Sequence, residues 1–222
     1  MATTVHEPPA MQSRPTLSQG GGGYSPKLPS WDRTALANSS PASRTGVWVA
    51  MAAITMTFVA ITSAMVVRQG ASLDWRHFTL PWVMYVDTLV LLLSSCTLQV
   101  ARKRVALYAR GVQAGRSIPA LWLWLTLALG FLFVAGQYVA WLQLKAQGWY
   151  LATNPSSSFF YLLTALHALH VLGGLAGLTL VIWRFSRRVP TLRLSTLTTV
   201  SYYWHFVDVL WIYLLLLLWA RI

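Results

Sequence analysis

Residues 159–183 read FFYLLTALHALHVLGGLAGLTLVIW, and this stretch decides the fold. It contains no Asp, Glu, Lys or Arg, and it is longer than the ~20 residues that an α-helix needs to cross a bilayer. It nevertheless carries two ionisable side chains, His167 and His170. Ionisable groups are costly at membrane depth and usually face the interior of a helix bundle. The stretch therefore predicts a transmembrane helix that packs among other helices.

The composition is that of an integral membrane protein. Of the 222 residues, 56% are hydrophobic and 10% are charged, whereas a soluble domain carries about 25% charged residues. The net charge of +12 does not indicate nucleic-acid binding, because the basic residues lie between apolar segments and not in one patch. The single cysteine, Cys96, excludes an internal disulfide and a multi-cysteine metal site. Its place in an apolar segment predicts a small buried side chain.

Five long apolar segments follow a tail of different composition. Residues 1–45 are rich in Pro and Gly and lack the apolar run of a signal peptide, which predicts a flexible tail. Residues 46–222 are expected to form an all-α domain, a polytopic membrane helix bundle with five transmembrane helices. The predicted spans lie at about 46–67, 80–101, 118–144, 158–183 and 197–220.

The distribution of basic residues predicts the orientation in the membrane. The tail and the loops after the second and fourth spans lie on one side, and they hold most of the 17 Lys and Arg residues. Cytoplasmic segments of membrane proteins carry the excess of Lys and Arg. We therefore expect the N-terminus, and with it the tail, in the cytoplasm and the C-terminus outside.

The fourth predicted span combines histidines with small residues. His167 and His170 are three residues apart, so we expect them to share one side of the helix. Gly174 continues the side of His170, and Gly173 and Gly177 form a small-x-x-x-small pattern beside it. Such patterns let a second helix approach closely. We therefore place this span at the centre of the bundle and expect its glycines to pack on another helix.

The fifth predicted span places a histidine beside a carboxylate. His205 and Asp208 are three residues apart and share a side, and Trp204 and Trp211 form a stripe with Asp208. With a rise of ~1.5 Å per residue, His170 of the antiparallel fourth span falls at the depth of Asp208. A hydrogen bond between His170 and Asp208 would satisfy both groups away from water, and the pattern favours one.

Three interpretations of these buried groups remain open from the residues alone. The first is structural, with the histidines and Asp208 bonding one another and fixing the helix register. The second is haem ligation, for which His167 and His170 cannot both serve, so one of them would need His205 or His77 as its partner. The third is a proton relay, as in membrane pumps. A metal site is not favoured, because no Glu or Cys lies beside the histidines.

Two further polar side chains lie inside predicted spans. Asp87 begins a polar stripe with Thr88, Ser94 and Ser95, and Gln137 lies in the third span. Hydrogen bonding between helices is favoured for the Asp87 stripe over a water or proton path, and another interhelical hydrogen bond is expected for Gln137. The sequence shows no nucleophile–base pair and no phosphate-binding loop, so we identify no catalytic residue and no complete active site.

Two motifs resemble a known family. The fourth span has an aromatic pair, a threonine, H-x-x-H-V and a glycine, and the fifth has Y-W-H-F-V-D followed by a tryptophan. The residues are Phe159, Phe160, Thr164, His167, His170, Val171, Gly174, Tyr203, Trp204, His205, Phe206, Val207, Asp208 and Trp211. This pattern resembles subunit III of the haem–copper oxidases, which comprise cytochrome c and quinol oxidases. The resemblance covers residues 44–220, and five spans match the shorter prokaryotic form.

The resemblance implies a role without chemistry of its own. Subunit III holds no haem or copper, which are expected in partner subunits. It packs on subunit I and contacts other oxidase subunits, binds structural phospholipid in a cleft between helices, and supports proton uptake and durable turnover. The complex reduces dioxygen and pumps protons in the prokaryotic inner membrane, in some cases within a larger respiratory supercomplex. This favours the structural interpretation, with a small haem-binding membrane redox protein as the alternative.

The chain departs from the family pattern at two positions. The family has an intramembrane glutamate in its first conserved helix, where this chain has Ile54. It has a second acidic residue near the end of the third span, where this chain has Ala140.

Overall fold

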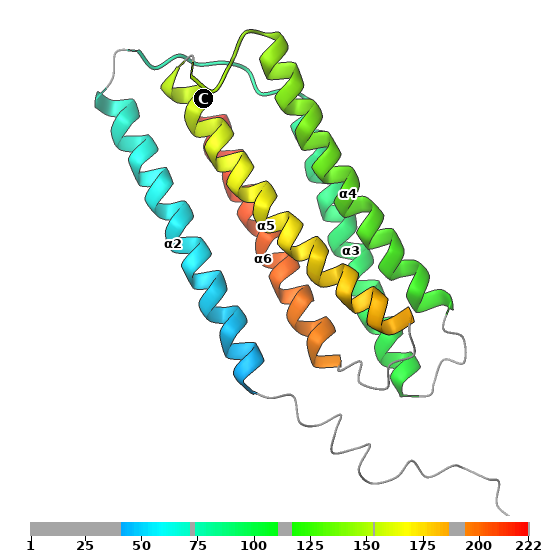
Figure 1. The fold of residues 1–222 in the computed structure, drawn as a ribbon. Helices are drawn as coiled ribbons and strands as arrows, with labels where there is room; N and C mark the ends of the chain where they lie inside the picture. The colour runs from blue at the N-terminus through cyan, green and yellow to red at the C-terminus, as the bar shows by residue number, and fades with distance from the viewer. Residues whose placement is uncertain (1–40, 72–73, 111–116, 153, 187–193, 222) are drawn as a thin grey trace, which may run out of the picture.

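The computed structural model describes residues 41–71, 74–110, 117–152, 154–186 and 194–221. They form five α-helices, each long and apolar enough to cross a membrane, so the predicted five-helix all-α class is confirmed (Figure 1). The helices are α2 (Pro41–Ala71), α3 (Val83–Ala109), α4 (Ser117–Ala146), α5 (Pro155–Ser186) and α6 (Leu194–Arg221). Most of the predicted tail lies outside the described residues.

The bounds of α2 and α3 differ most from the sequence prediction. Helix α2 begins at Pro41, inside the predicted tail, because proline is well suited to the first turn of a helix. Helix α3 runs from Val83 to Ala109 and not from 80 to 101. A turn at Pro81 delays its start, and the basic residues after 101 continue the helix, since Lys and Arg are good helix formers.

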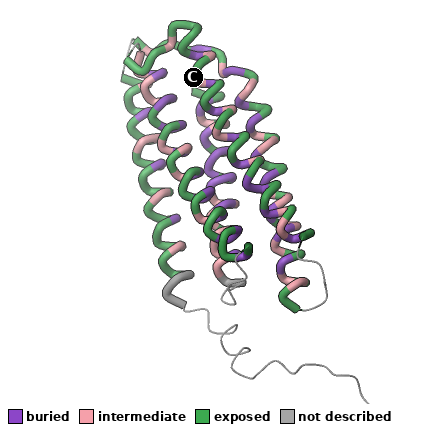
Figure 2. The backbone as a smooth tube through the Cα atoms, turned by 45° about the vertical axis from the view of Figure 1, so that its right-hand side comes forward, coloured by how far each residue is buried: buried purple, intermediate pink, exposed green. Residues whose placement is uncertain are grey.

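Four helices form a compact group and α2 lies at one side of it. Helices α3 and α4 pack along their length, and α5 and α6 complete the group, while α2 contacts only α5 and α6 closely (Figure 1). Of the span in α2, 17% is buried, against 39% in α5 and in α6. The tube of α2 is accordingly exposed over most of its length (Figure 2).

Glycines on two helices admit the largest side chain of the core. The indole of Trp204 on α6 is 2% exposed. A Cβ at Gly130 on α4 would lie 2.8 Å from its Cη2 atom, and a Cβ at Gly174 on α5 would lie 3.1 Å from its Cε3 atom. Three helices can therefore meet around one tryptophan because two of them lack a side chain there.

The lone cysteine is not buried. Cys96 is exposed on the outer side of α3, so the prediction of a buried side chain is wrong. An apolar segment that crosses the membrane can leave a side chain such as Cys96 outside the bundle, because lipid covers it there.

Candidate functional site

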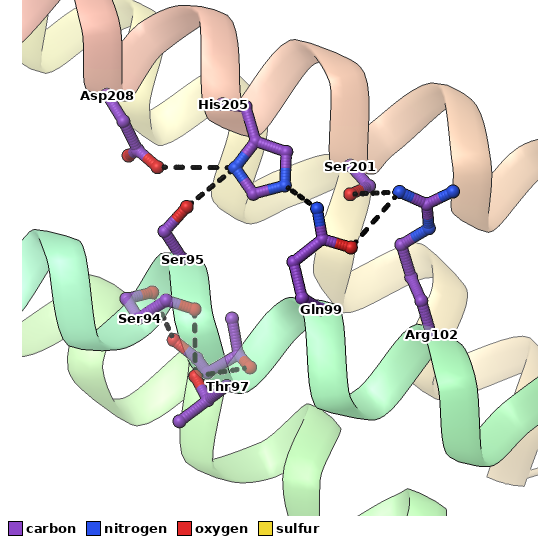
Figure 3. A network of polar contacts seen from close by, with 9 residues as sticks. Ser94, Ser95, Thr97, Gln99, Arg102, Ser201, His205 and Asp208 are labelled. Carbon is purple, nitrogen blue, oxygen red and sulfur yellow. Dashed lines mark hydrogen bonds and ion pairs between the residues drawn. The ribbon is translucent and has the colours of Figure 1, made fainter.

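A network of polar side chains joins α3 to α6 (Figure 3). The hydroxyl of Ser95 lies 2.6 Å from Nδ1 of His205, and the amide nitrogen of Gln99 lies 2.8 Å from Nε2. On α6, Nδ1 of His205 also lies 3.7 Å from a carboxylate oxygen of Asp208. Ser95 and Gln99 are four residues apart and His205 and Asp208 three apart, so each pair occupies one side of its helix.

The same network extends toward the end of α3. Arg102 donates from Nη1 to the Gln99 side-chain oxygen and to the Ser201 hydroxyl, both at 3.3 Å. Its guanidinium also lies over the Tyr202 ring, 5.7 Å from the centroid. We call the connected set the polar ladder; it comprises Ser95, Gln99, Arg102, Ser201, His205 and Asp208 (Figure 3).

The ladder determines the tautomer of His205. A guanidinium can only donate, so the oxygen of the Gln99 amide faces Arg102 and its nitrogen faces His205. Because that nitrogen donates, Nε2 of His205 accepts and Nδ1 carries the proton. The Nδ1 proton then points toward Ser95 and the Asp208 carboxylate. The Gln99 amide and the His205 ring therefore lie between the positive charge of Arg102 and Asp208.

A second polar contact joins α3 to α4. Nε2 of Gln137 donates to Oδ2 of Asp87 at 2.8 Å, and both side chains are buried. A Cβ at Gly136 would overlap the Asp87 carboxylate, so only glycine fits there. The sequence predicted an interhelical hydrogen bond for Asp87 and one for Gln137, but it did not pair the two residues or indicate a role for Gly136. No local pattern identifies Gly136, because its neighbour is distant in the sequence.

His167 and His170 do not act as a pair. His167 is fully buried, with its ring centroid 6.0 Å from that of Phe133 on α4 and 4.9 Å from that of Trp211 on α6. The His170 ring lies 5.7 Å from Phe58 on α2. Residues three apart on a helix differ by about 60° in direction, which follows from 3.6 residues per turn. That difference is enough to send the two rings to different helices.

The favoured hydrogen bond between His170 and Asp208 is absent. Nδ1 of His170 lies 2.7 Å from the carbonyl oxygen of Leu166 in its own helix, while the histidine beside Asp208 is His205, at 3.7 Å. Equal depth would be necessary for a contact between two side chains, but it is not sufficient. His170 turns toward α2, and Asp208 turns toward α3.

The glycines of α5 lie against α6. A Cβ at Gly173 would be 3.6 Å from the hydroxyl of Tyr203, and one at Gly177 would be 3.5 Å from Val200. Gly174 lies against Trp204 in the same way. The sequence predicted that these glycines pack on another helix, and that helix is α6.

The proposed haem ligands have separate surroundings. Both ring nitrogens of His205 are engaged by side chains of α3, whereas His167 meets α4 and α6. His77 lines a pocket near the start of α3 and the end of α6, together with Tyr85 and Trp219. Within the described residues, no three His, Cys, Asp or Glu side chains are grouped so as to hold a metal ion.

The two positions where the family pattern has carboxylates hold apolar side chains. Ile54 is partly buried on α2, and Ala140 is buried on α4. The described carboxylates inside the bundle are instead Asp87 and Asp208.

Comparison with known proteins places these features in a family. The family model for cytochrome c oxidase subunit III matches residues 54–221, which include most of α2 and all of α3 to α6. The chain belongs to the cytochrome c oxidase subunit III family. Membership makes it a multi-pass membrane subunit of an oxidase complex.

Individual members of the subunit III family show similar sequences. The chain is 33% identical over 177 residues to cytochrome c oxidase subunit 3 of Thermostichus vulcanus, covering 78% of this chain and 84% of that protein. It is 34% identical over 146 residues to cytochrome c oxidase subunit 3 of Corynebacterium diphtheriae, covering 65% and 66%. With the Synechocystis protein of the same name it shares 40% identity over 98 residues, covering 43% and 41%.

A double-mutant cycle tests the ladder. We expect His205→Gln and Asp208→Asn to lower the free energy of unfolding in detergent, with losses that are less than additive by about 0.5–3 kcal/mol, because each change removes the same interaction. His170→Gln combined with Asp208→Asn is the matched control and should be additive within about 0.5 kcal/mol. Additive losses for the first pair would contradict a direct interaction between His205 and Asp208.

Proposed function

We propose that this chain is a subunit III without an active site of its own, which packs on the oxidase subunit that holds haem and copper. The observation that carries this proposal is the polar ladder. His205 bonds Ser95 and Gln99 on α3 through its two ring nitrogens, and it lies 3.7 Å from Asp208 on its own helix. Such networks fix the register and orientation of helices in a bundle.

The proposal includes support for proton uptake and for the stability of the complex. The N-terminus would lie in the cytoplasm and the C-terminus outside the prokaryotic inner membrane, since Lys and Arg concentrate at the end of the bundle that holds Arg102 and Arg184. Haem and copper belong to partner subunits in this account. The chain stabilises the assembled oxidase, and the ladder holds the rigid bundle that does so.

Removal of the chain tests this function. A complex purified without the subunit should retain its haem and copper and should begin to consume dioxygen, but it should lose activity faster during turnover than the complete complex. The chain purified alone should show no Soret absorption. A Soret band that disappears in His205→Ala would contradict the proposal and favour the alternative, a small haem-binding redox protein. Immediate loss of all turnover would contradict a supporting role.

Phospholipid binding is proposed at the loosely packed helix α2. Two apolar grooves flank it, with volumes of about 320 and 250 Å³. The first is lined by Trp48, Met51, Ala52, Thr55, Tyr202 and Phe206, and the second by Val47, Gly173, Gly174, Gly177, Thr199, Val200 and Tyr203. Acyl chains fit such surfaces, and basic side chains near this end, such as Arg184, suit an anionic headgroup.

Filling one groove tests lipid binding. The Cβ of a leucine at Gly177 would make ordinary contact with Val200, and the rest of the side chain would extend into the 250 Å³ groove. We expect Gly177→Leu to reduce co-purified phospholipid, measured by mass spectrometry of lipid extracts, and thermal stability is measured alongside because Gly177 also packs on Val200 of α6. Gly70→Leu is the matched control, because nothing lies within 4 Å of a Cβ at Gly70. Equal lipid content in both variants would contradict the assignment of lipid to this groove.

A further inference from the structure

The end of the bundle that holds Arg102 carries positive charge without a described carboxylate beside it. Arg102 is half-buried just beyond the predicted 80–101 span, and the exposed Lys103 and Arg104 follow it. Of the described carboxylates, one follows α2 at the opposite end of the bundle and two are buried within it; they are Asp74, Asp87 and Asp208. Among the described residues, Arg102 therefore forms no ion pair, and its charge can attract an anion from outside the chain.

The guanidinium of Arg102 uses one of its three nitrogens to bond the described part of the chain. Nη1 donates to the side-chain oxygens of Gln99 and Ser201, both at 3.3 Å. Nε and Nη2 donate to no described residue, and Figure 3 shows the second terminal nitrogen pointing away from both oxygens. A guanidinium binds a phosphate through two parallel hydrogen bonds. Nε and Nη2 of Arg102 supply such a pair of donors.

Tyr202 connects this arginine to an apolar groove. The Arg102 guanidinium lies over the Tyr202 ring, 5.7 Å from its centroid, and the centroid of the Trp48 ring on α2 lies 6.4 Å from the same point. Tyr202 and Trp48 also line the groove of about 320 Å³ between α2 and α6. Tyrosine and tryptophan are enriched at the level of lipid headgroups. Arg102 therefore lies beside the headgroup end of this groove.

The rest of the groove is suited to a hydrocarbon chain. It runs about 10 Å along α2 from Trp48 to Thr55, away from the basic end of the bundle. The Thr55 hydroxyl donates to the carbonyl oxygen of Met51 in its own helix, so it does not make the groove polar. The remaining walls include the apolar side chains of Ala52 and Phe206. A molecule that matches both parts of this site has an apolar chain and an anionic head.

We infer that the groove between α2 and α6 holds an anionic phospholipid, whose phosphate accepts hydrogen bonds from Nε and Nη2 of Arg102. The inference rests on the proposed function, which places lipid at α2, and it assigns the class of headgroup and the residue that selects it. A zwitterionic headgroup carries a cation beside its phosphate, and the positive charges of Arg102, Lys103 and Arg104 repel that cation. An anionic headgroup is attracted by all three. Arg102 therefore sets a preference for anionic over zwitterionic lipid.

Competition between two phospholipids tests the headgroup assignment. The full chain is extracted from vesicles that contain equal amounts of phosphatidylglycerol and phosphatidylcholine with identical acyl chains, and the retained lipids are counted by native mass spectrometry. We expect phosphatidylglycerol to be retained about fivefold over phosphatidylcholine, the preference that one basic residue gives near an anionic surface. Arg102→Gln should bring this ratio close to one. Arg102→Lys should keep part of it, because lysine retains the charge but not the two parallel donors.

Two matched controls separate this site from general surface charge and from loss of the fold. Arg184→Gln removes one exposed charge at the same end of the bundle, outside the groove, and should leave the ratio unchanged. Ala52→Leu fills the groove at an exposed position without touching the polar ladder, and it should lower both the retained phosphatidylglycerol and the ratio. Ala53→Leu, at an exposed position that lines neither groove, should change nothing. Thermal stability is measured for every variant.

The outcomes distinguish the headgroup assignment from lipid binding itself. An unchanged ratio in Arg102→Gln or in Ala52→Leu would overturn the inference, as would an equal fall in Arg184→Gln. Ala52→Leu decides the question if Arg102→Gln does not fold. Retention of both lipids in the vesicle ratio by the unmodified chain would also overturn it, and would favour an acidic side chain of a neighbouring subunit as the partner of Arg102. If the unmodified chain retains no phospholipid at all, the proposed lipid binding itself fails.

Discussion

The chain of polar contacts from Arg102 through Gln99 and His205 to Asp208 is the constraint on which the arrangement of α3 and α6 depends. Each member has its place fixed by the next: the guanidinium orients the Gln99 amide, and the amide fixes the tautomer of His205. Nδ1 of the imidazole then lies 2.6 Å from the Ser95 hydroxyl and 3.7 Å from a carboxylate oxygen of Asp208, a residue that is 4% exposed. A carboxylate buried in a membrane bundle without a partner would be strongly destabilising. One rotation of α6 brings His205 to Ser95 and Gln99 and places Asp208 beside His205.

That rotation also explains the apolar packing. When His205 faces α3, Trp204 and Trp211 on other sides of α6 point into the core. Trp204 lies in the space left by glycines on α4 and α5, and Trp211 stacks against His167 and donates to Thr88. The polar contacts and the glycine contacts thus specify the same packing of α6. A sequence specifies one structure when its different kinds of interaction agree in this way. Helix α2 takes little part in either, which leaves its grooves open for lipid in the account proposed here.

The sequence predicted what depends on local pattern. Apolar run lengths were sufficient for five spans, and spacing was sufficient to place His205 beside Asp208. It did not predict which helix each side chain meets, because a rotation of about 60° separates His167 from His170 and sends the latter to α2. The need for Gly136 was hidden for a related reason, since the Asp87 carboxylate reaches it from another helix. The exposure of Cys96 depends on which side of α3 the bundle leaves open.

The protonation of the His205 ring tests the central claim most directly. Solid-state ¹⁵N NMR of the histidine-labelled chain in lipid bilayers, with His205 assigned by the loss of its signals in His205→Gln, distinguishes the two ring nitrogens. The ladder predicts a neutral ring with the proton on Nδ1 and with Nε2 as an acceptor, and a mixture of tautomers in Gln99→Leu. A proton on Nε2 in the unmodified chain, or a tautomer that does not respond to Gln99→Leu, would contradict the account.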